Sequence, residues 1–341
     1  MSGVNRIHVD TSMTNDHQQR HSMTRLQHRR RLLQMVFFLI FILAPPLDLF
    51  RFDLTQSHFV VLGATWSLGL DAVISGEVGA TQAFTGFFIR GLLPLAFLVG
   101  LFIWVSWRYG RLYCGWLCPH FSVVEWINGL MRRATGKSSL WDRKKSPETR
   151  ADGQSRPVNR LYWLALIASV LVFSFTWALV LLTYLLPPVM IYNNLIQGTL
   201  TFNQSLFLSV GTVIFALEFM FARHLFCRFG CAVGVFQSLV WMGNRKAMVV
   251  GFDRKRSDVC KDCQVACEHE CPMRLKPRSI KRKMFTCTEC GRCLSACEQV
   301  QEGLTNGRPP LLQWVQDECA LDVSSRDFGV RPQVPCDCYK R

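Results

Sequence analysis

Long apolar stretches alternate with polar segments along the first two thirds of the chain. Four of them, at roughly 32–50, 87–107, 161–186 and 203–222, hold enough apolar residues to cross a hydrocarbon core about 30 Å thick. The fourth is the weakest, because Glu218 lies near its end. No small-residue cleavage site follows the first, which indicates an anchor rather than a removable signal peptide. The pattern predicts a membrane domain with four transmembrane helices within residues 32–250.

Basic residues are unevenly distributed among the segments that join these helices. The loop 108–160 carries eleven Lys and Arg against four acids, and the chain after the fourth stretch carries twenty Lys and Arg. The loop 51–86 has one basic residue, and the loop 187–202 has no charge. Because basic loops stay on the cytoplasmic side, both termini and the middle loop are predicted to be cytoplasmic. The protein is expected to be a multi-pass protein of the bacterial cytoplasmic (inner) membrane.

The chain has a formal net charge of +15, and half of its residues are hydrophobic. A basic excess of this size is typical of proteins that bind nucleic acid or an anionic membrane surface. Here the basic residues flank apolar segments and no nucleic-acid-binding motif is present, so we expect contact with membrane lipids and no nucleic acid. The polar segment 1–31 is predicted to be a disordered cytoplasmic tail.

Fifteen cysteines are present, and most follow one another at intervals of three or four residues. In a small secreted protein such a count would indicate a disulfide framework. Most of these cysteines lie in segments predicted to face the reducing cytoplasm. Metal ligation is therefore the better interpretation.

The segment from Cys287 to Cys297 has the spacing C-x2-C-x2-C-x3-C. In bacterial ferredoxins three cysteines of such a run bind one [4Fe–4S] cluster, and the fourth binds the neighbouring cluster. A zinc ribbon would instead have two C-x2-C pairs separated by a longer insert. The spacing therefore favours iron–sulfur over a zinc-stapled domain without a redox role.

A related motif runs from Cys260 to Cys271, with one additional residue between its second and third cysteines. Exchange of the fourth ligands predicts two [4Fe–4S] clusters, bound by Cys260, Cys263, Cys267 and Cys297 and by Cys287, Cys290, Cys293 and Cys271. The additional residue leaves open whether Cys267 is a ligand or is displaced in favour of His269. The predicted fold is mainly α: a four-helix transmembrane anchor, a cytoplasmic α+β dicluster ferredoxin-like domain at 251–300, and a C-terminal tail at 301–341.

Two C-x3-C pairs occupy corresponding positions in two repeated helical hairpins: Cys114 with Cys118, and Cys227 with Cys231. At i and i+4 on a helix both thiols of a pair face the same side, which suits a shared soft metal better than a disulfide. An internal repeat tends to bring equivalent positions together. The four cysteines are therefore predicted to form a third metal or redox site, for copper or an iron–sulfur centre. The alternative is that they are small apolar packing residues.

The order of these motifs resembles the polyferredoxin-type membrane 4Fe-4S proteins, a family that includes NapH, MauN, the C-terminal half of NosR and CcoG. The similarity rests on the segment from Gly110 to Pro119, the later Cys227–Cys231 pair and the two ferredoxin motifs, and it covers most of residues 32–300. It implies a protein that relays electrons between quinol or a soluble cytoplasmic donor and a partner oxidoreductase.

Two other functions stay open: a copper-handling reductase or assembly factor of the CcoG type, and a redox or metal sensor. No nucleophile–base set or substrate-pocket signature is visible, so no catalytic residue is assigned. The sequence favours an electron-transfer subunit over a complete enzyme, such as a quinol dehydrogenase component or a cupric reductase.

Weaker candidates each have a plainer alternative. Arg90 and Glu218 lie near the ends of predicted spans, where such residues mark a quinone or proton site or simply reach the interface. His120 and His224 neighbour the C-x3-C pairs and are candidate metal ligands. A final C-x-C at 336–338 has the spacing of a soft-metal site, but an incidental role is favoured.

Overall fold

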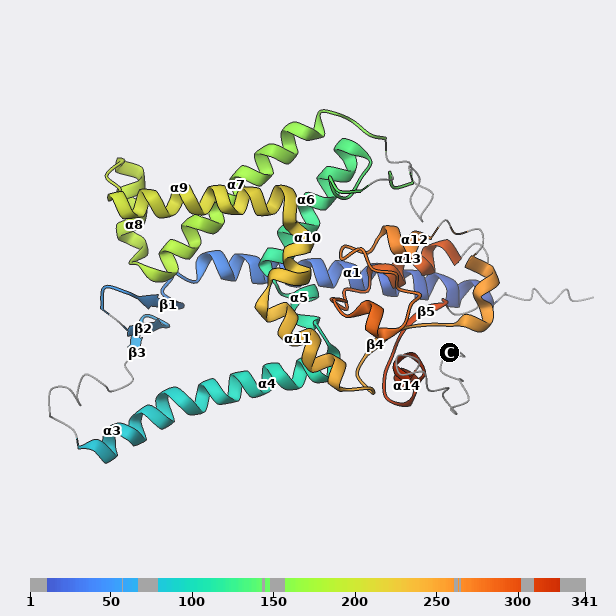
Figure 1. The fold of residues 1–341 in the computed structure, drawn as a ribbon, viewed down its shortest axis with the longest axis horizontal. Coiled ribbons are helices and arrows are strands. Elements are labelled where there is room, and N and C mark those ends of the chain that lie inside the picture. The colour runs from blue at the N-terminus through green and yellow to red at the C-terminus, as the bar shows by residue number, and fades with distance from the viewer. Residues whose placement is uncertain are drawn as a thin grey trace, which may run out of the picture.

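The computed structural model describes residues 11–56, 58–66, 79–142, 145–147, 157–260, 263, 265–301 and 310–325. Over these residues the fold is mainly helical, with two small antiparallel sheets. Long helices extend toward one end of the molecule, and the cysteine-rich segment forms the other end (Figure 1). The predicted α-rich architecture with a small α+β unit is thus observed.

Three helices within the described residues are long and apolar enough to cross a membrane: Phe84–Tyr109, Tyr162–Leu185 and Phe202–Gly243. The first comprises the end of α3 (Ala80–Phe87), the π-helical η1 (Phe88–Leu92) and α4 (Leu93–Tyr109), and the second is α7 (Tyr162–Leu185). α8 (Pro188–Gln197) connects α7 to the third. Many of their large apolar side chains are exposed in the isolated chain, as expected for a surface that contacts lipid. The stretches predicted at 87–107, 161–186 and 203–222 are all parts of these helices.

The helix expected at 32–50 is shorter than predicted. α1 (Thr11–Leu43) ends before a turn, and β1 (Phe50–Asp53), β2 (His58–Val61) and β3 (Ala64–Trp66) then form an antiparallel sheet. Pro45 and Pro46 account for this end, because proline lacks a backbone donor and its ring clashes with the preceding turn. The apolar part of α1 from residue 32 is about 18 Å long. By itself it does not reach across a core of about 30 Å.

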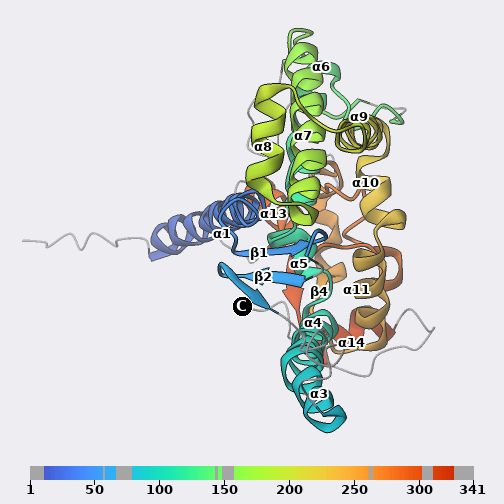
Figure 2. The same cartoon turned by 90° about the vertical axis from the view of Figure 1, so that its left-hand side faces the viewer.

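Two copies of one helical unit follow each other in the chain. In the first, α4 is followed by α5 (Leu112–Trp116) and α6 (Pro119–Thr135). In the second, α9 (Phe202–Leu217) continues through η2 (Glu218–Ala222), α10 (Arg223–Leu225) and η3 (Phe226–Gly230) into α11 (Ala232–Gly243). The last helix of each copy packs on the other half: α6 lies against α7, and α11 lies against α4 (Figure 2). This exchange interlocks the halves and brings their connecting segments together near the centre.

The cysteine-rich unit is built on a two-stranded sheet. β4 (Val249–Phe252) pairs with β5 (Leu312–Val315), with Val249 opposite Val315. The other elements are η4 (Arg254–Cys260), α12 (Ala266–His269), η5 (Lys281–Met284), α13 (Arg292–Gln301) and α14 (Glu318–Ser325). Arg108, at the end of α4, donates two hydrogen bonds to the Asp317 carboxylate, at 2.9 and 3.0 Å. Residues 310–325, assigned to the tail from their composition, are therefore part of this unit.

The polar half of α1 also differs from the expected disordered tail. Residues 11–31 continue the helix, and the segment from Arg25 packs against α5, α6 and α13. Arg30 is only 2% exposed. A charged side chain is buried to this degree only where other groups compensate it, so burial rather than composition decides the structure here. Residues 1–10 lie outside the described residues.

Candidate functional site

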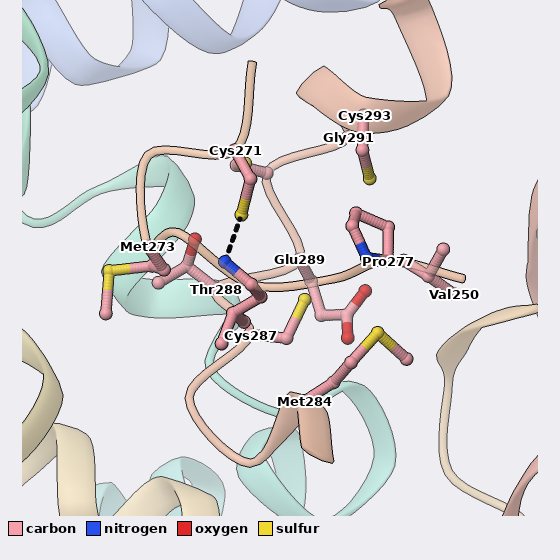
Figure 3. Close-up of a pocket in the computed structure, with 12 residues that line it drawn as sticks. Val250, Cys271, Met273, Pro277, Met284, Cys287, Thr288, Glu289, Gly291 and Cys293 are labelled. Carbon is pink, nitrogen blue, oxygen red and sulfur yellow. Dashed lines mark hydrogen bonds between the residues drawn. The ribbon is translucent and has the colours of Figure 1, made fainter. Parts of the chain in front are cut away.

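A pocket lies in the cysteine-rich unit, and four of the residues that line it are Cys271, Cys287, Cys290 and Cys293 (Figure 3). The chain turns tightly here, because Glu289 and Gly291 adopt positive φ angles of 48° and 70°. The backbone N–H of Leu275 donates to the Cys271 sulfur at 3.4 Å. The rest of the lining is mainly apolar, including Met273, Met284 and Pro277. The structure thus brings together the four cysteines that the sequence analysis had assigned to one cluster, Cys287, Cys290, Cys293 and Cys271.

A second pocket is lined by Cys260, Cys263, Cys267 and Cys297. The additional residue of the first motif is accommodated at Val265, whose φ of 59° is left-handed and which precedes α12. This turn directs Cys267 into the pocket, where it is buried. His269 is not among the lining residues. The two pockets share α13, which contributes Cys293 to one and Cys297, one helical turn later, to the other.

Burial dominates the electrostatics of both pockets. It raises the pKa of Cys267 to about 12 and that of Cys297 to about 11. Burial also raises the pKa of Glu289, in the first pocket, to about 7, while the indole N–H of Trp314 donates to its carboxylate at 2.9 Å. Neutral thiols bind metals poorly, since the ligand is the thiolate. A cluster that bound in these pockets would therefore displace protons from the thiols.

Within the described ranges, no three His, Cys, Asp or Glu side chains lie close enough to hold one metal ion. A [4Fe–4S] cluster has four cysteine ligands, and these are distributed over four iron atoms. The four cysteines around each pocket match the number of ligands that such a cluster requires.

The spacing had suggested that the two cysteines of each C-x3-C pair lie on one continuous helix. In the structure the helix is interrupted between them. Cys114 lies in α5 and Cys227 in η3, whereas Cys118 and Cys231 are the N-cap residues of α6 and α11. Both copies have the same interruption. Because the halves interlock, the two interrupted segments lie close together. The thiols are near enough to interact electrostatically across the repeat, Cys114 and Cys118 with Cys231, and Cys227 with Cys118. Burial is the main cause that raises the pKa of Cys118 to about 12.

The first C-x3-C pair lies directly against the first pocket. A Cβ added at Gly115 would overlap the backbone carbonyl oxygen of Thr288, between two pocket cysteines. The indole N–H of Trp116 donates to the Glu289 carbonyl oxygen at 3.0 Å. Cys118 and Cys227 share one apolar cluster with Cys271 and Cys287. The membrane motif and the ferredoxin motif are thus in direct contact.

A buried charge network secures this contact. Arg30 of α1 donates to both carboxylate oxygens of Glu125, at 3.0 and 2.9 Å, and to the Gly115 carbonyl oxygen at 2.9 Å. Arg292 of α13 joins Glu125, at 3.3 Å, to Glu270, at 2.6 Å. Burial alone would raise the pKa of Glu125, but the charges of Arg30 and Arg292 hold it below its usual value. The ionised carboxylate therefore connects α1, α6 and α13.

The variant Glu125→Gln is expected to destabilise the folded protein by about 3–5 kcal/mol, because it leaves Arg30 and Arg292 buried without their shared counter-charge. Since the pKa of Glu125 is lowered in the folded state, its contribution is complete above the ordinary carboxyl pKa and is lost as pH falls through the lowered value. Thermal unfolding in detergent at neutral and acidic pH measures both effects. Glu318→Gln, in an exposed ion pair with Lys246, is the control and should change stability little. Equal stability of the two variants would contradict this role.

The weaker candidates fall in different places. His120 Nε2 lies 3.3 Å from a carboxylate oxygen of Glu218, so two residues considered separately in the sequence form a pair. His224 is buried, whereas Arg90 lies in η1 and is exposed. Cys319 is disulfide-bonded and is thus separate from the twelve free cysteines found among the described residues. Residues 336 and 338 lie outside the described residues.

Sequence reasoning missed several residues that shape this site. Arg30 was assigned to a tail, and Gly115 and Arg111 lie in the segment from Gly110 to Pro119 but were given no role of their own. The motif itself carried a signal for Gly115, because glycine lacks a Cβ and permits the close approach of another backbone segment. No local signal distinguishes Arg30 from its neighbours Arg29 and Arg31.

The family model described as "4Fe-4S binding domain" matches residues 91–138 and 202–248. These segments contain the two C-x3-C pairs and coincide with the two structural copies. The match therefore confirms the internal repeat. No solved structure matches the chain.

Curated relatives are distant. "Ferredoxin-type protein NapH" of Escherichia coli is 24% identical over 67% of this chain and 70% of its own length. "Methylamine utilization ferredoxin-type protein MauN" of Paracoccus denitrificans is 29% identical over 60% and 59%. "Putative electron transport protein YccM" of Escherichia coli is 22% identical over 60% and 52%. The resemblance inferred from the motif order is confirmed: the chain carries a repeated 4Fe-4S binding domain and is a distant homologue of the ferredoxin-type membrane proteins NapH, MauN and YccM.

Proposed function

We propose that this protein is an electron-transfer subunit that relays single electrons between quinol or a cytoplasmic donor and a partner oxidoreductase. The observation that carries the proposal is the pair of pockets, each lined by four cysteines and joined through α13. Iron–sulfur clusters bound there would supply one-electron chemistry, with potentials set by their ligands, hydrogen bonds and burial. The chain's own residues hold the cluster ligands, exclude water and fix the distance between the two sites.

The four C-x3-C cysteines are proposed to hold a third centre at the cytoplasmic surface of the membrane. One atom, Arg111 Nη2, contacts both the Cys114 sulfur and the Cys227 carbonyl oxygen, which supports convergence of the two pairs. The matched 4Fe-4S model contains them, which favours iron–sulfur over copper. Their sulfurs also do not converge tightly enough for one ion within the described ranges.

The contacts between the sites suggest an order for the relay. The buried C-x3-C site contacts the first pocket through Gly115, and the first pocket contacts the second through α13. Cys260 and Cys263 of the second pocket are only partly buried. Electrons from the membrane would therefore pass the C-x3-C site, then the first pocket, and leave from the second pocket to a soluble partner. A cytoplasmic donor would use the same path in reverse.

The test is to purify the full chain anaerobically and measure bound metals together with the EPR spectrum after dithionite reduction. Two clusters require about eight iron atoms per chain and a spin-coupled signal, and a third cluster requires about twelve. Zinc in place of iron would contradict the electron-transfer function. Copper retained at the C-x3-C site would support the copper-handling alternative instead.

We also propose that α1 crosses the membrane together with the turn that follows it, because Tyr184, near the end of α7, donates to the Phe41 carbonyl oxygen. This fourth crossing would place both termini in the cytoplasm. Exposed apolar side chains on α1, such as Met35 and Leu39, support lipid contact, and the loop charges support the orientation. A reporter fused at Asn194 is expected to be extracytoplasmic, and reporters at Lys145 and Gly303 cytoplasmic. Extracytoplasmic labelling at Lys145 would overturn both the orientation and the reduced state of the cysteines.

A further inference from the structure

Arg111 begins the first C-x3-C motif and is 1% exposed. Its Nη2 atom donates to the Cys227 carbonyl oxygen at 2.6 Å and lies 4.0 Å from the Cys114 sulfur. The guanidinium therefore joins one cysteine of each copy. Space for it is provided by α11, where a Cβ added at Gly234 would overlap the guanidinium. α5 and α11 lie side by side near the centre of the molecule (Figures 1 and 2).

No acidic side chain among the described residues forms an ion pair with Arg111. Across the part of the chain that the structure describes, its Nε and Nη1 atoms have no hydrogen-bond partner. Its observed partners are a neutral carbonyl oxygen and a sulfur. A buried charge without a counter-charge is costly. Such a guanidinium indicates that an anionic group completes the site.

We infer that Arg111 is the counter-charge of an anionic metal–thiolate centre at Cys114, Cys118, Cys227 and Cys231. The inference rests on the third centre of the proposed function and adds its charge and the residue that tunes it. Four thiolates carry more negative charge than a cubane core neutralises. A fixed positive charge and an N–H close to sulfur stabilise the reduced state and raise the potential.

The second copy provides a natural comparison. Arg223 also begins its motif and is fully buried, and its three side-chain nitrogens lack hydrogen-bond partners among the described residues. It lies one residue farther from its cysteine than Arg111 does, and its φ is 28°. Its nitrogens therefore make no hydrogen bond to a cysteine, whereas Arg111 contacts Cys114 and Cys227. Among the described residues, it is the first copy that supplies this guanidinium to the cysteines.

The test uses the full-length protein, purified anaerobically, and an EPR-monitored redox titration. The signal of the third centre is defined as the part that disappears in Cys114→Ser with Cys227→Ser. Arg111→Gln is expected to lower the midpoint potential of the third centre by about 59 mV or more. For a one-electron centre this corresponds to a tenfold or larger change in the oxidised-to-reduced ratio. Arg111→Lys keeps the positive charge and should recover most of the lost potential. Arg223→Gln, the matched control, should leave the potential unchanged.

The outcomes separate the inference from the function on which it rests. An unchanged potential in Arg111→Gln, with the third centre loaded, would overturn the role of Arg111 and leave the relay intact. The absence of a third signal in the unmodified protein would overturn both the third centre and this inference. If Arg111→Gln does not accumulate, Gly234→Ala displaces the guanidinium while its charge is kept in the chain. An unchanged potential in that variant would also contradict the inference.

Discussion

The double substitution Cys114→Ser with Cys227→Ser is expected to abolish electron transfer between the membrane and the ferredoxin pockets. The two cysteines come from different copies and are both buried, so their loss removes half of the sulfur ligands of the proposed third centre. The ligands of the two ferredoxin pockets lie elsewhere in the chain. Their EPR signals should therefore persist. Reduction of the clusters by quinol in membrane vesicles, compared with reduction by dithionite, measures the difference.

The variant Cys290→Ser is the matched counterpart, because it removes a ligand of the first pocket. It should lower the iron content by about four atoms per chain and weaken the neighbouring cluster through the shared α13. Normal quinol-dependent reduction in the double variant would indicate that the C-x3-C cysteines are packing residues and not ligands. Loss of all cluster signals in the double variant would instead mean that these cysteines serve assembly of the whole protein.

Gly115→Ala is expected to slow transfer between the C-x3-C site and the first pocket while both remain loaded. The added Cβ would overlap the Thr288 carbonyl oxygen, so the ferredoxin loop must move away from the membrane motif. Overpacking of this kind costs about 1–3 kcal/mol. Electron transfer becomes slower as the distance between two centres grows, so a displaced loop should lower the rate. Stopped-flow reduction of the clusters in nanodiscs measures the rate, and iron content confirms loading.

The control for this variant is Gly129→Ala in α6, where an added Cβ meets no atom within 4 Å. Alanine is favoured over glycine in a helix interior, so this variant should transfer electrons normally and unfold at the same or a slightly higher temperature. Equal transfer rates in Gly115→Ala and Gly129→Ala would show that electrons do not pass through the Gly115 contact.

The sequence by itself determined the features that depend on spacing along the chain. The C-x2-C-x2-C-x3-C run grouped Cys287, Cys290 and Cys293, and the structure places them around one pocket with Cys271. Three of the four apolar stretches lie in helices long enough to span a membrane. The repeated C-x3-C pairs revealed the duplication that the family match confirms. In each case the physical cause is local: cluster geometry requires short intervals, and a bilayer requires a long apolar helix.

Only the tertiary structure decided which distant groups meet. Arg30 and Arg31 are neighbours of the same type, yet only Arg30 is directed at Glu125, almost a hundred positions later. The exchange of α6 and α11 between the halves brings Arg111 to Cys227. The periodicity of apolar residues in the sequence does not predict this exchange. The fit of the additional residue before Cys267 depends on a left-handed turn at Val265, a residue type that rarely adopts one. Burial, charge compensation and backbone strain depend on what surrounds a residue, and spacing along the chain does not encode those surroundings.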